Sequence, residues 1–175
     1  IPGLVPFVRP PYYAVLLSPL AFWPLDTAFH VWIAGQIAVL ALICWWGVRR
    51  FGPDALILGA MFYPTAIGIA NGQDCALMLA LVVLAFITME RGHRSLAGAL
   101  FALTLVKFHL LILVPITAAV RKQWRFLAGY AAMAVAALAA SVLLSGVDGL
   151  IQYAQLLTNK NLERLSPSEE LMVNL

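Results

Sequence analysis

The chain is poor in charged residues. Of its 175 residues, 11% are charged and 63% are hydrophobic, whereas soluble domains carry about 25% charged residues. Apolar runs of near-bilayer length at this density exclude an ordinary soluble domain and predict a multi-pass membrane protein. The net charge of +3 comes from basic residues in short loops, without a basic stripe, so we expect no nucleic-acid partner.

Cysteines and catalytic motifs are also scarce. Cys44 and Cys75 have no metal-ligand spacing and imply no disulfide framework. The sequence has no Walker loop, dinucleotide fingerprint, zinc pattern or nucleophile elbow, which argues against soluble nucleotide chemistry. We assign no metal site and no cofactor from the sequence. The chain begins without Met or a signal-type segment, so we interpret it as an internal fragment of a longer protein.

Prolines crowd the first 28 residues, at positions 2, 6, 10, 11, 19 and 24. This density excludes one continuous helix. We expect an outer loop with short interfacial helices over residues 1–28, and an N-cap at Asp26 or Thr27 for the helix that follows.

Five apolar segments predict an all-α, polytopic transmembrane helix bundle that forms a single domain over residues 1–175. They are residues 29–48, 55–70, 75–89, 96–120 and 126–144. Basic residues after the first and third segments place those ends in the cytoplasm, with residues 1–28 and 146–175 outside. Ala132, Ala136 and Ala140 form a small-residue stripe that would permit close helix packing.

The segment 96–120 allows two interpretations. As a single span it would place the basic residues Arg121–Arg125 outside and Lys107 at mid-membrane, where a lysine costs about 2.5–3.5 kcal/mol. Two half-length helices, Leu96–Val106 and Leu110–Val120, would remove both problems as a re-entrant or broken hairpin. We favour the hairpin, and the single span stays an alternative.

Two polar clusters interrupt the apolar runs and are the candidate site. Asp74 lies beside Gln73 in the turn Asn71–Asp74, between two apolar runs, and could bind a hydroxyl or a metal, or serve only as an N-cap. Lys107 and His109 lie within the next apolar run. An intramembrane ionisable residue suggests a functional site, and the ammonium could bind a lipid phosphate. Alternatively, Lys107 snorkels to the interface or pairs with a buried carboxylate. Arg9 in the outer loop could also meet a phosphate.

Four stretches resemble glycosyltransferase family 87 (DUF2029) in order and spacing. They are Pro6–Tyr12 with Ser18–Ala21, Asn71–Asp74, Ala97–Leu100 leading to Val106–Leu110, and Gln123–Arg125. The resemblance covers nearly the whole chain, from Pro6 to about Tyr153.

This resemblance implies a membrane glycosyltransferase of the GT-C type, a mannosyltransferase or other hexosyltransferase, in the bacterial plasma membrane. Its partners would be a polyprenyl-phosphate-linked sugar donor, a lipid or glycan acceptor and membrane lipids. The sugar would move to an acceptor hydroxyl on the extracytoplasmic side. The general base of the family lies upstream of the proline-rich stretch, so no catalytic residue is assigned here, and the fragment alone should be inactive. Substrate-binding roles fall on Arg9, Gln73, Asp74, Lys107 and His109.

Two other classes stay open on the residues alone. Secondary transporters also build substrate sites from broken membrane helices, so a carrier or flippase of a lipid-linked or phosphorylated sugar would show the same Lys107 cluster. An Asp or Glu in the first outer loop upstream would favour the transferase, and an inverted repeat of these spans would favour the carrier. A catalytically inactive membrane scaffold is the third class.

Overall fold

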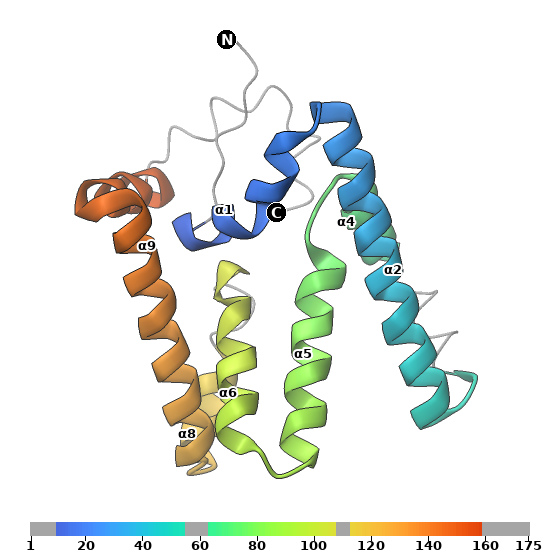
Figure 1. Ribbon diagram of the computed structural model, residues 1–175. Helices are drawn as coiled ribbons and strands as arrows, with labels where there is room; N and C mark the ends of the chain where they lie inside the picture. The colour runs from blue at the N-terminus through green and yellow to red at the C-terminus, as the bar shows by residue number, and fades with distance from the viewer. Residues whose placement is uncertain (1–9, 55–62, 108–112, 159–175) are drawn as a thin grey trace. The chain divides into compact units, whose positions relative to one another are not determined.

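The computed structural model of the chain describes residues 10–54, 63–107 and 113–158 (Figure 1). Their regular structure is entirely helical, which confirms the all-α prediction. The helices are α1 (Pro11–Leu17), η1 (Ser18–Phe22), α2 (Leu25–Phe51), α4 (Tyr63–Ala70), α5 (Cys75–Glu90), α6 (Arg94–Ala102), η2 (Leu103–Lys107), α8 (Leu113–Val120) and α9 (Trp124–Thr158). The chain divides into two compact units. Unit 1 combines residues 1–18 with 136–175, and unit 2 is residues 19–135.

Two helices in the described part are long and apolar enough to cross a membrane. They are α2, with 27 residues, and the first 32 residues of α9, Trp124–Gln155. At 1.5 Å per residue, about 20 helical residues match a hydrocarbon core of about 30 Å. The predicted spans 29–48 and 126–144 lie inside these two helices.

The other predicted segments are shorter or divided. The segment 75–89 is α5, which has 16 residues. The segment 96–120 is divided into α6 with η2, and α8, and the first part of 55–70 lies outside the described residues. Helix α9 is kinked at Gly146, whose φ of 70° is a left-handed conformation that glycine adopts readily.

The start of α2 corrects one prediction. The helix begins at Leu25 with Pro24 at the N-cap, so neither Asp26 nor Thr27 caps it. Proline suits a helix start because it has no N–H to satisfy and its φ is already helical. Asp26 lies in the first turn, where a carboxylate is favoured by the helix dipole.

The core of unit 2 lies between α5, α6, α8 and the start of α9. Its buried members are Ala85, Ala97, Phe101, Ala118 and Phe126. A Cβ added at Gly98 would overlap the Phe126 carbonyl oxygen, and one added at Gly129 would overlap the Ser95 carbonyl oxygen. Glycine therefore allows α6 and α9 to touch backbone to backbone. In the predicted alanine stripe, Ala132 and Ala136 are exposed, so this contact uses glycines instead.

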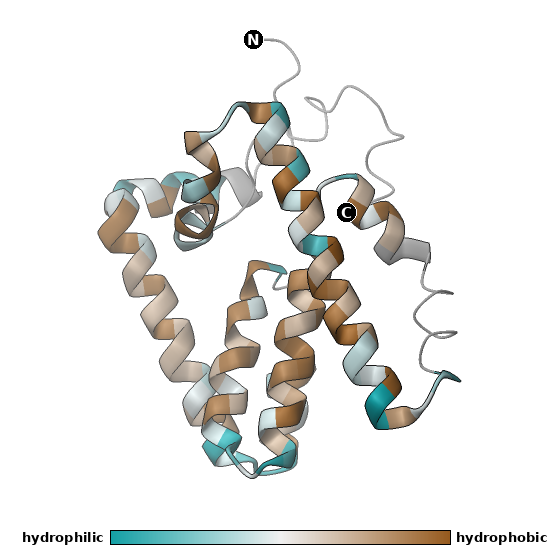
Figure 2. Ribbon diagram, turned by 45° about the vertical axis from the view of Figure 1, so that its right-hand side comes forward, coloured by the Kyte–Doolittle hydropathy of each residue, from teal (hydrophilic) through white to brown (hydrophobic). Residues whose placement is uncertain are grey.

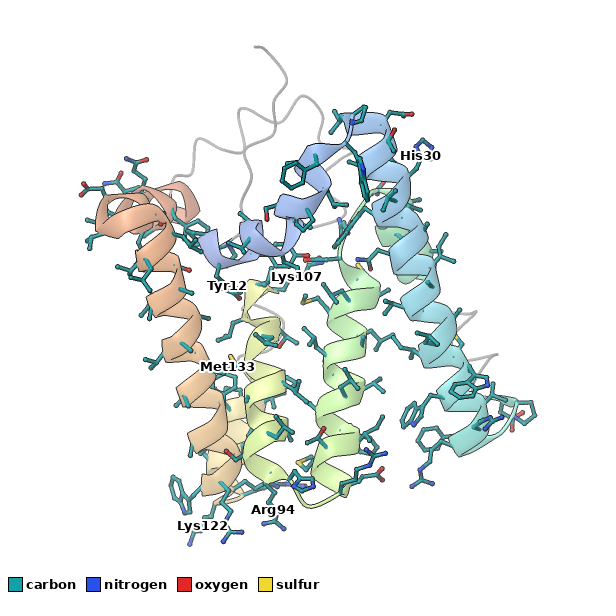
Figure 3. All side chains as sticks on the ribbon, viewed as in Figure 1. Tyr12, His30, Arg94, Lys107, Lys122 and Met133 are labelled. Carbon is teal, nitrogen blue, oxygen red and sulfur yellow. The ribbon has the colours of Figure 1, made fainter. Side chains whose placement is uncertain are left out.

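Basic residues gather at one end of unit 2. Arg50 at the end of α2 lies 3.3 Å from Glu90 at the end of α5, and the Arg49 guanidinium lies 4.6 Å from the Trp45 ring centre. Figure 2 shows the hydrophilic turn between α5 and α6 at this end and hydrophobic residues along the helices. Arg94 and Lys122 lie at this end, whereas Lys107 lies at the other end of α6 and η2 (Figure 3). Helices α6 and α8 therefore run in opposite directions.

Unit 1 joins the first helix to the far part of α9. The Tyr12 backbone N–H donates a 3.3 Å hydrogen bond to Ser141 Oγ, and Tyr13 is buried. Burial, with a smaller contribution from Tyr153, raises the pKa of Tyr12 to about 12. This hydrogen bond anchors α1 on α9.

Candidate functional site

The turn Asn71–Asp74 ends α4 and leads into α5. The Gln73 N–H donates to the Gly68 carbonyl at 2.8 Å, and the Gly72 N–H to the Ile69 carbonyl at 2.9 Å. These bonds satisfy carbonyls at the end of α4, as a glycine-terminated helix does. Gly72 has a φ of +73°, and a Cβ there would lie 2.9 Å from the Phe29 ring. Glycine at position 72 is therefore needed for the shape of this turn.

Helix α2 holds the turn from one side. The Trp32 indole N–H donates a 2.9 Å hydrogen bond to the Gly72 carbonyl. One turn later, Gln36 Oε1 accepts hydrogen bonds from the Ala76 and Leu77 N–H groups at 3.1 and 3.2 Å. The side chain of Gln36 thus caps α5 from a neighbouring helix. It also occupies two of the N–H groups to which an anion would bind at a helix N-terminus.

Lys107 reaches the turn from η2. The Thr104 hydroxyl donates to the Phe101 carbonyl at 2.5 Å, and the α-helix tightens into a 3-10 turn at Leu103. Such local side-chain bonds compete with the regular helix ladder, and this turn ends at Lys107. Its ammonium lies 3.0 Å from Asp74 Oδ1, with the side chains of Lys107 and Asp74 12% and 2% exposed.

Two further polar groups lie beside this ion pair. Lys107 Nζ is 3.9 Å from Cys75 Sγ, and Cys75 Sγ is 3.7 Å from Gln73 Oε1. A carboxylate, an ammonium, a thiol and an amide thus meet at the start of α5. We call these four residues (Gln73, Asp74, Cys75 and Lys107) the polar cluster. Desolvating two charges is costly, so a pair this buried depends on its mutual geometry.

The polar cluster could do two things chemically. Its ammonium could share its donors between Asp74 and an incoming anion, since a lysine has three N–H donors. The amide of Gln73 could orient a sugar hydroxyl. Among the described residues, no group of three or more His, Cys, Asp or Glu side chains could hold a metal ion.

The structure brings together three of the five predicted site residues. Gln73, Asp74 and Lys107 lie in one cluster, whereas Arg9 and His109 lie outside the described residues. Asp74 occupies the N-cap position of α5 but makes no side-chain capping bond there. Its carboxylate faces Lys107 instead, which is the alternative of a lysine paired with a buried carboxylate. Substrate binding by these residues stays a prediction.

Sequence reasoning missed Gln36 and Trp32. Gln36 is a neutral amide within the predicted span 29–48, and it is 3% exposed. The rule that singled out Lys107, a polar side chain inside an apolar run, applies to Gln36 in weaker form because an amide costs less to bury than a charge. That signal could have found it, but not its partners, because they lie 40 residues away.

Comparison with known protein families assigns the chain to a family. A model of glycosyltransferase family 87 matches residues 7–173. The chain therefore belongs to glycosyltransferase family 87, which confirms the resemblance seen in the sequence. Together with the two long apolar helices, this membership identifies a membrane protein of glycosyltransferase type. No curated protein and no solved structure matches the chain.

Proposed function

We propose that the full-length protein is an integral-membrane hexosyltransferase that moves a sugar, mannose in the first instance, from a polyprenyl-phosphate donor to an acceptor hydroxyl. The acceptor is a lipid or glycan. The observation that carries this proposal is the buried Asp74–Lys107 pair in a chain of glycosyltransferase family 87. A cation near the leaving phosphate stabilises the charge that develops there in the transition state.

The charge of the polar cluster favours a monophosphate donor. Lys107 is already faced by a carboxylate at 3.0 Å, so an anion bound there adds uncompensated negative charge. A polyprenyl-phosphate sugar is a phosphodiester with one negative charge, whereas a diphosphate-linked or nucleotide sugar carries more. Buried negative charge is costly unless it is paired, so the monoanion fits this cluster best.

The basic end of unit 2 supports an extracytoplasmic site. Arg50, Arg94 and Lys122 lie at the end opposite to Lys107. The positive-inside rule assigns such an end to the cytoplasm, and the polar cluster then faces the outer side of a bacterial plasma membrane. We also propose the full GT-C-like bundle, with a re-entrant hairpin formed by the antiparallel helices α6 and α8.

The site residues would then have separate tasks. Lys107 binds the donor phosphate, with Arg9 and His109 as further donors to it. Gln73 and Asp74 orient sugar or acceptor hydroxyls, which a hydrogen-bonding site discriminates strongly. None of these five residues is assigned as the general base.

The test is release of polyprenyl phosphate from a polyprenyl-phosphate-mannose donor by the full-length protein in liposomes. The double variant Asp74→Asn/Lys107→Met removes the cation and keeps the local charge balanced. Release should fall on the order of 100-fold, as loss of one transition-state donor does. The control variant Glu90→Gln/Arg50→Met removes the exposed pair at the other end and should release normally.

Unchanged release of polyprenyl phosphate in the Asp74/Lys107 double variant would refute the role of Lys107. A well-folded wild-type protein that releases no polyprenyl phosphate, but moves the labelled donor across the bilayer, would instead identify a lipid-linked sugar carrier. A nucleotide-sugar donor used in preference to the lipid donor would overturn the charge argument.

A further inference from the structure

Gln36 is a polar side chain buried in the apolar helix α2. It is 3% exposed, and its Oε1 accepts hydrogen bonds from the Ala76 and Leu77 N–H groups at 3.1 and 3.2 Å. Burying an amide without partners is unfavourable, and the bonds to the start of α5 compensate for it. A glutamine that faced lipid would have no hydrogen-bond partner to offset the cost of burying its amide.

The hydrogen bonds of Gln36 hold residues that follow Asp74 directly in the chain. Ala76 and Leu77 follow Asp74 by two and three positions, so Gln36 sets where α5 begins. Trp32, one helical turn before Gln36, holds the Gly72 carbonyl two positions before Asp74 at 2.9 Å. Hydrogen bonds from α2 therefore hold the chain on both sides of Asp74, whose carboxylate faces Lys107 at 3.0 Å.

The distance between the two charges depends on these hydrogen bonds. Asp74 and Lys107 come from different elements, the start of α5 and the end of η2, and 32 residues separate α5 at Cys75 from Lys107. A shift of the α5 start by one ångström would lengthen a 3.0 Å contact into a weak one. In a buried setting the two charges have no water to replace the lost contact.

We propose that Gln36 is a positioning residue, which acts through the start of α5 to hold Asp74 against Lys107 and thereby aims the ammonium at the donor phosphate. The part that concerns the phosphate rests on the proposed function. The part that concerns the geometry of the ion pair stands without it. Gln36 itself touches the α5 backbone and is assigned no contact with substrate.

Cys75 is a native reporter of this geometry, because it is the first residue of α5 and its Sγ lies 3.9 Å from Lys107 Nζ. The full-length protein is prepared with Cys75 as its only cysteine, and its rate of maleimide labelling is measured in detergent. Gln36→Leu removes the acceptor at similar size. The neighbouring Ile37 side chain is 55% exposed, so Ile37→Ala is the control.

We expect Gln36→Leu to label about fivefold faster than wild type, the factor that the loss of a helix cap gives in a local equilibrium. Ile37→Ala should label at the wild-type rate. If Gln36→Leu does not purify as folded protein, Gln36→Met provides the same test, since it removes the same acceptor with an unbranched side chain of similar length. A folded variant without the Gln36 acceptor that is labelled at the wild-type rate overturns the proposal.

The second readout is polyprenyl phosphate release, combined with the Asp74→Asn/Lys107→Met variant in a mutant cycle. If Gln36 acts through the pair, Gln36→Leu lowers release about tenfold in the wild-type background and leaves the residual release of the pair variant unchanged. Additive losses overturn the proposal, because they show that Gln36 acts elsewhere. Faster labelling in a protein that releases no polyprenyl phosphate upholds the geometry of the pair and refutes the proposed function.

Discussion

Removing Lys107 alone should destabilise the protein far more than removing an exposed arginine in a similar pair. The perturbation is Lys107→Met in the full-length protein. It leaves the Asp74 carboxylate, 2% exposed, without the ammonium that now faces it at 3.0 Å. The matched change is Arg50→Met, which frees Glu90 at the other end of unit 2 from a partner at 3.3 Å.

The two distances are similar, so burial decides the difference. At an effective dielectric constant of about 20, charges 3.0 Å apart attract by about 5 kcal/mol. Breaking a buried pair by removing one partner costs about 3–5 kcal/mol. The side chains of Arg50 and Glu90 are 53% and 41% exposed, so at a dielectric constant near that of water the attraction is about 1 kcal/mol. Side-chain entropy and salt reduce that further.

The assay is unfolding in mixed micelles of increasing SDS mole fraction, followed by tryptophan fluorescence. Lys107→Met should lower the free energy of unfolding by about 3–5 kcal/mol, and Arg50→Met by less than about 1 kcal/mol. Adding Asp74→Asn to Lys107→Met should restore most of the loss, because no buried charge is then left unpaired. Equal losses at the two sites, or no recovery in the double variant, would refute the reasoning from burial.

Three further predictions follow from other contacts. Gly98→Ala should destabilise unit 2 by about 1–3 kcal/mol or more, because its methyl group overlaps the Phe126 carbonyl oxygen; an unfolding midpoint equal to that of wild type would show that the helices can separate freely. Gly72→Ala should cost about 1–3 kcal/mol through its positive φ and the Phe29 ring, and replacing Phe29 by Ala as well should recover only the steric part, measured in the same unfolding assay. Tyr12 should ionise near pH 12 in the folded protein, against 10.0 for the free side chain; because its folded pKa is raised, its contribution to stability is complete below about pH 10 and lost as the pH rises to about 12. The difference in phenolate absorbance between wild type and Tyr12→Phe measures this, and ionisation near pH 10 would contradict burial of the ring.

The sequence alone was sufficient for properties that depend on composition and local pattern. Low charge and long apolar runs predicted a helical membrane protein, and the spans 29–48 and 126–144 lie inside α2 and α9. Family-specific motifs, read in order, identified glycosyltransferase family 87. Helix boundaries were less certain: the sequence placed a cap at Asp26 or Thr27, whereas Pro24 begins the helix. Caps depend on local backbone angles, and several nearby residues suit that role equally.

Lys107 and Asp74 were each recognisable from the sequence, because an ionisable residue inside or beside an apolar run is costly and seldom accidental. That they face each other was one of several alternatives, since neither periodicity nor spacing relates residues 33 positions apart on different helices. Only the tertiary structure decided that Asp74 pairs with Lys107 and leaves the start of α5 to be capped by Gln36. The physical reason is that transfer into a membrane depends on the summed hydrophobicity of many residues, which the sequence contains. Hydrogen bonds and ion pairs act between two atoms, and they depend on where the fold places those atoms in space.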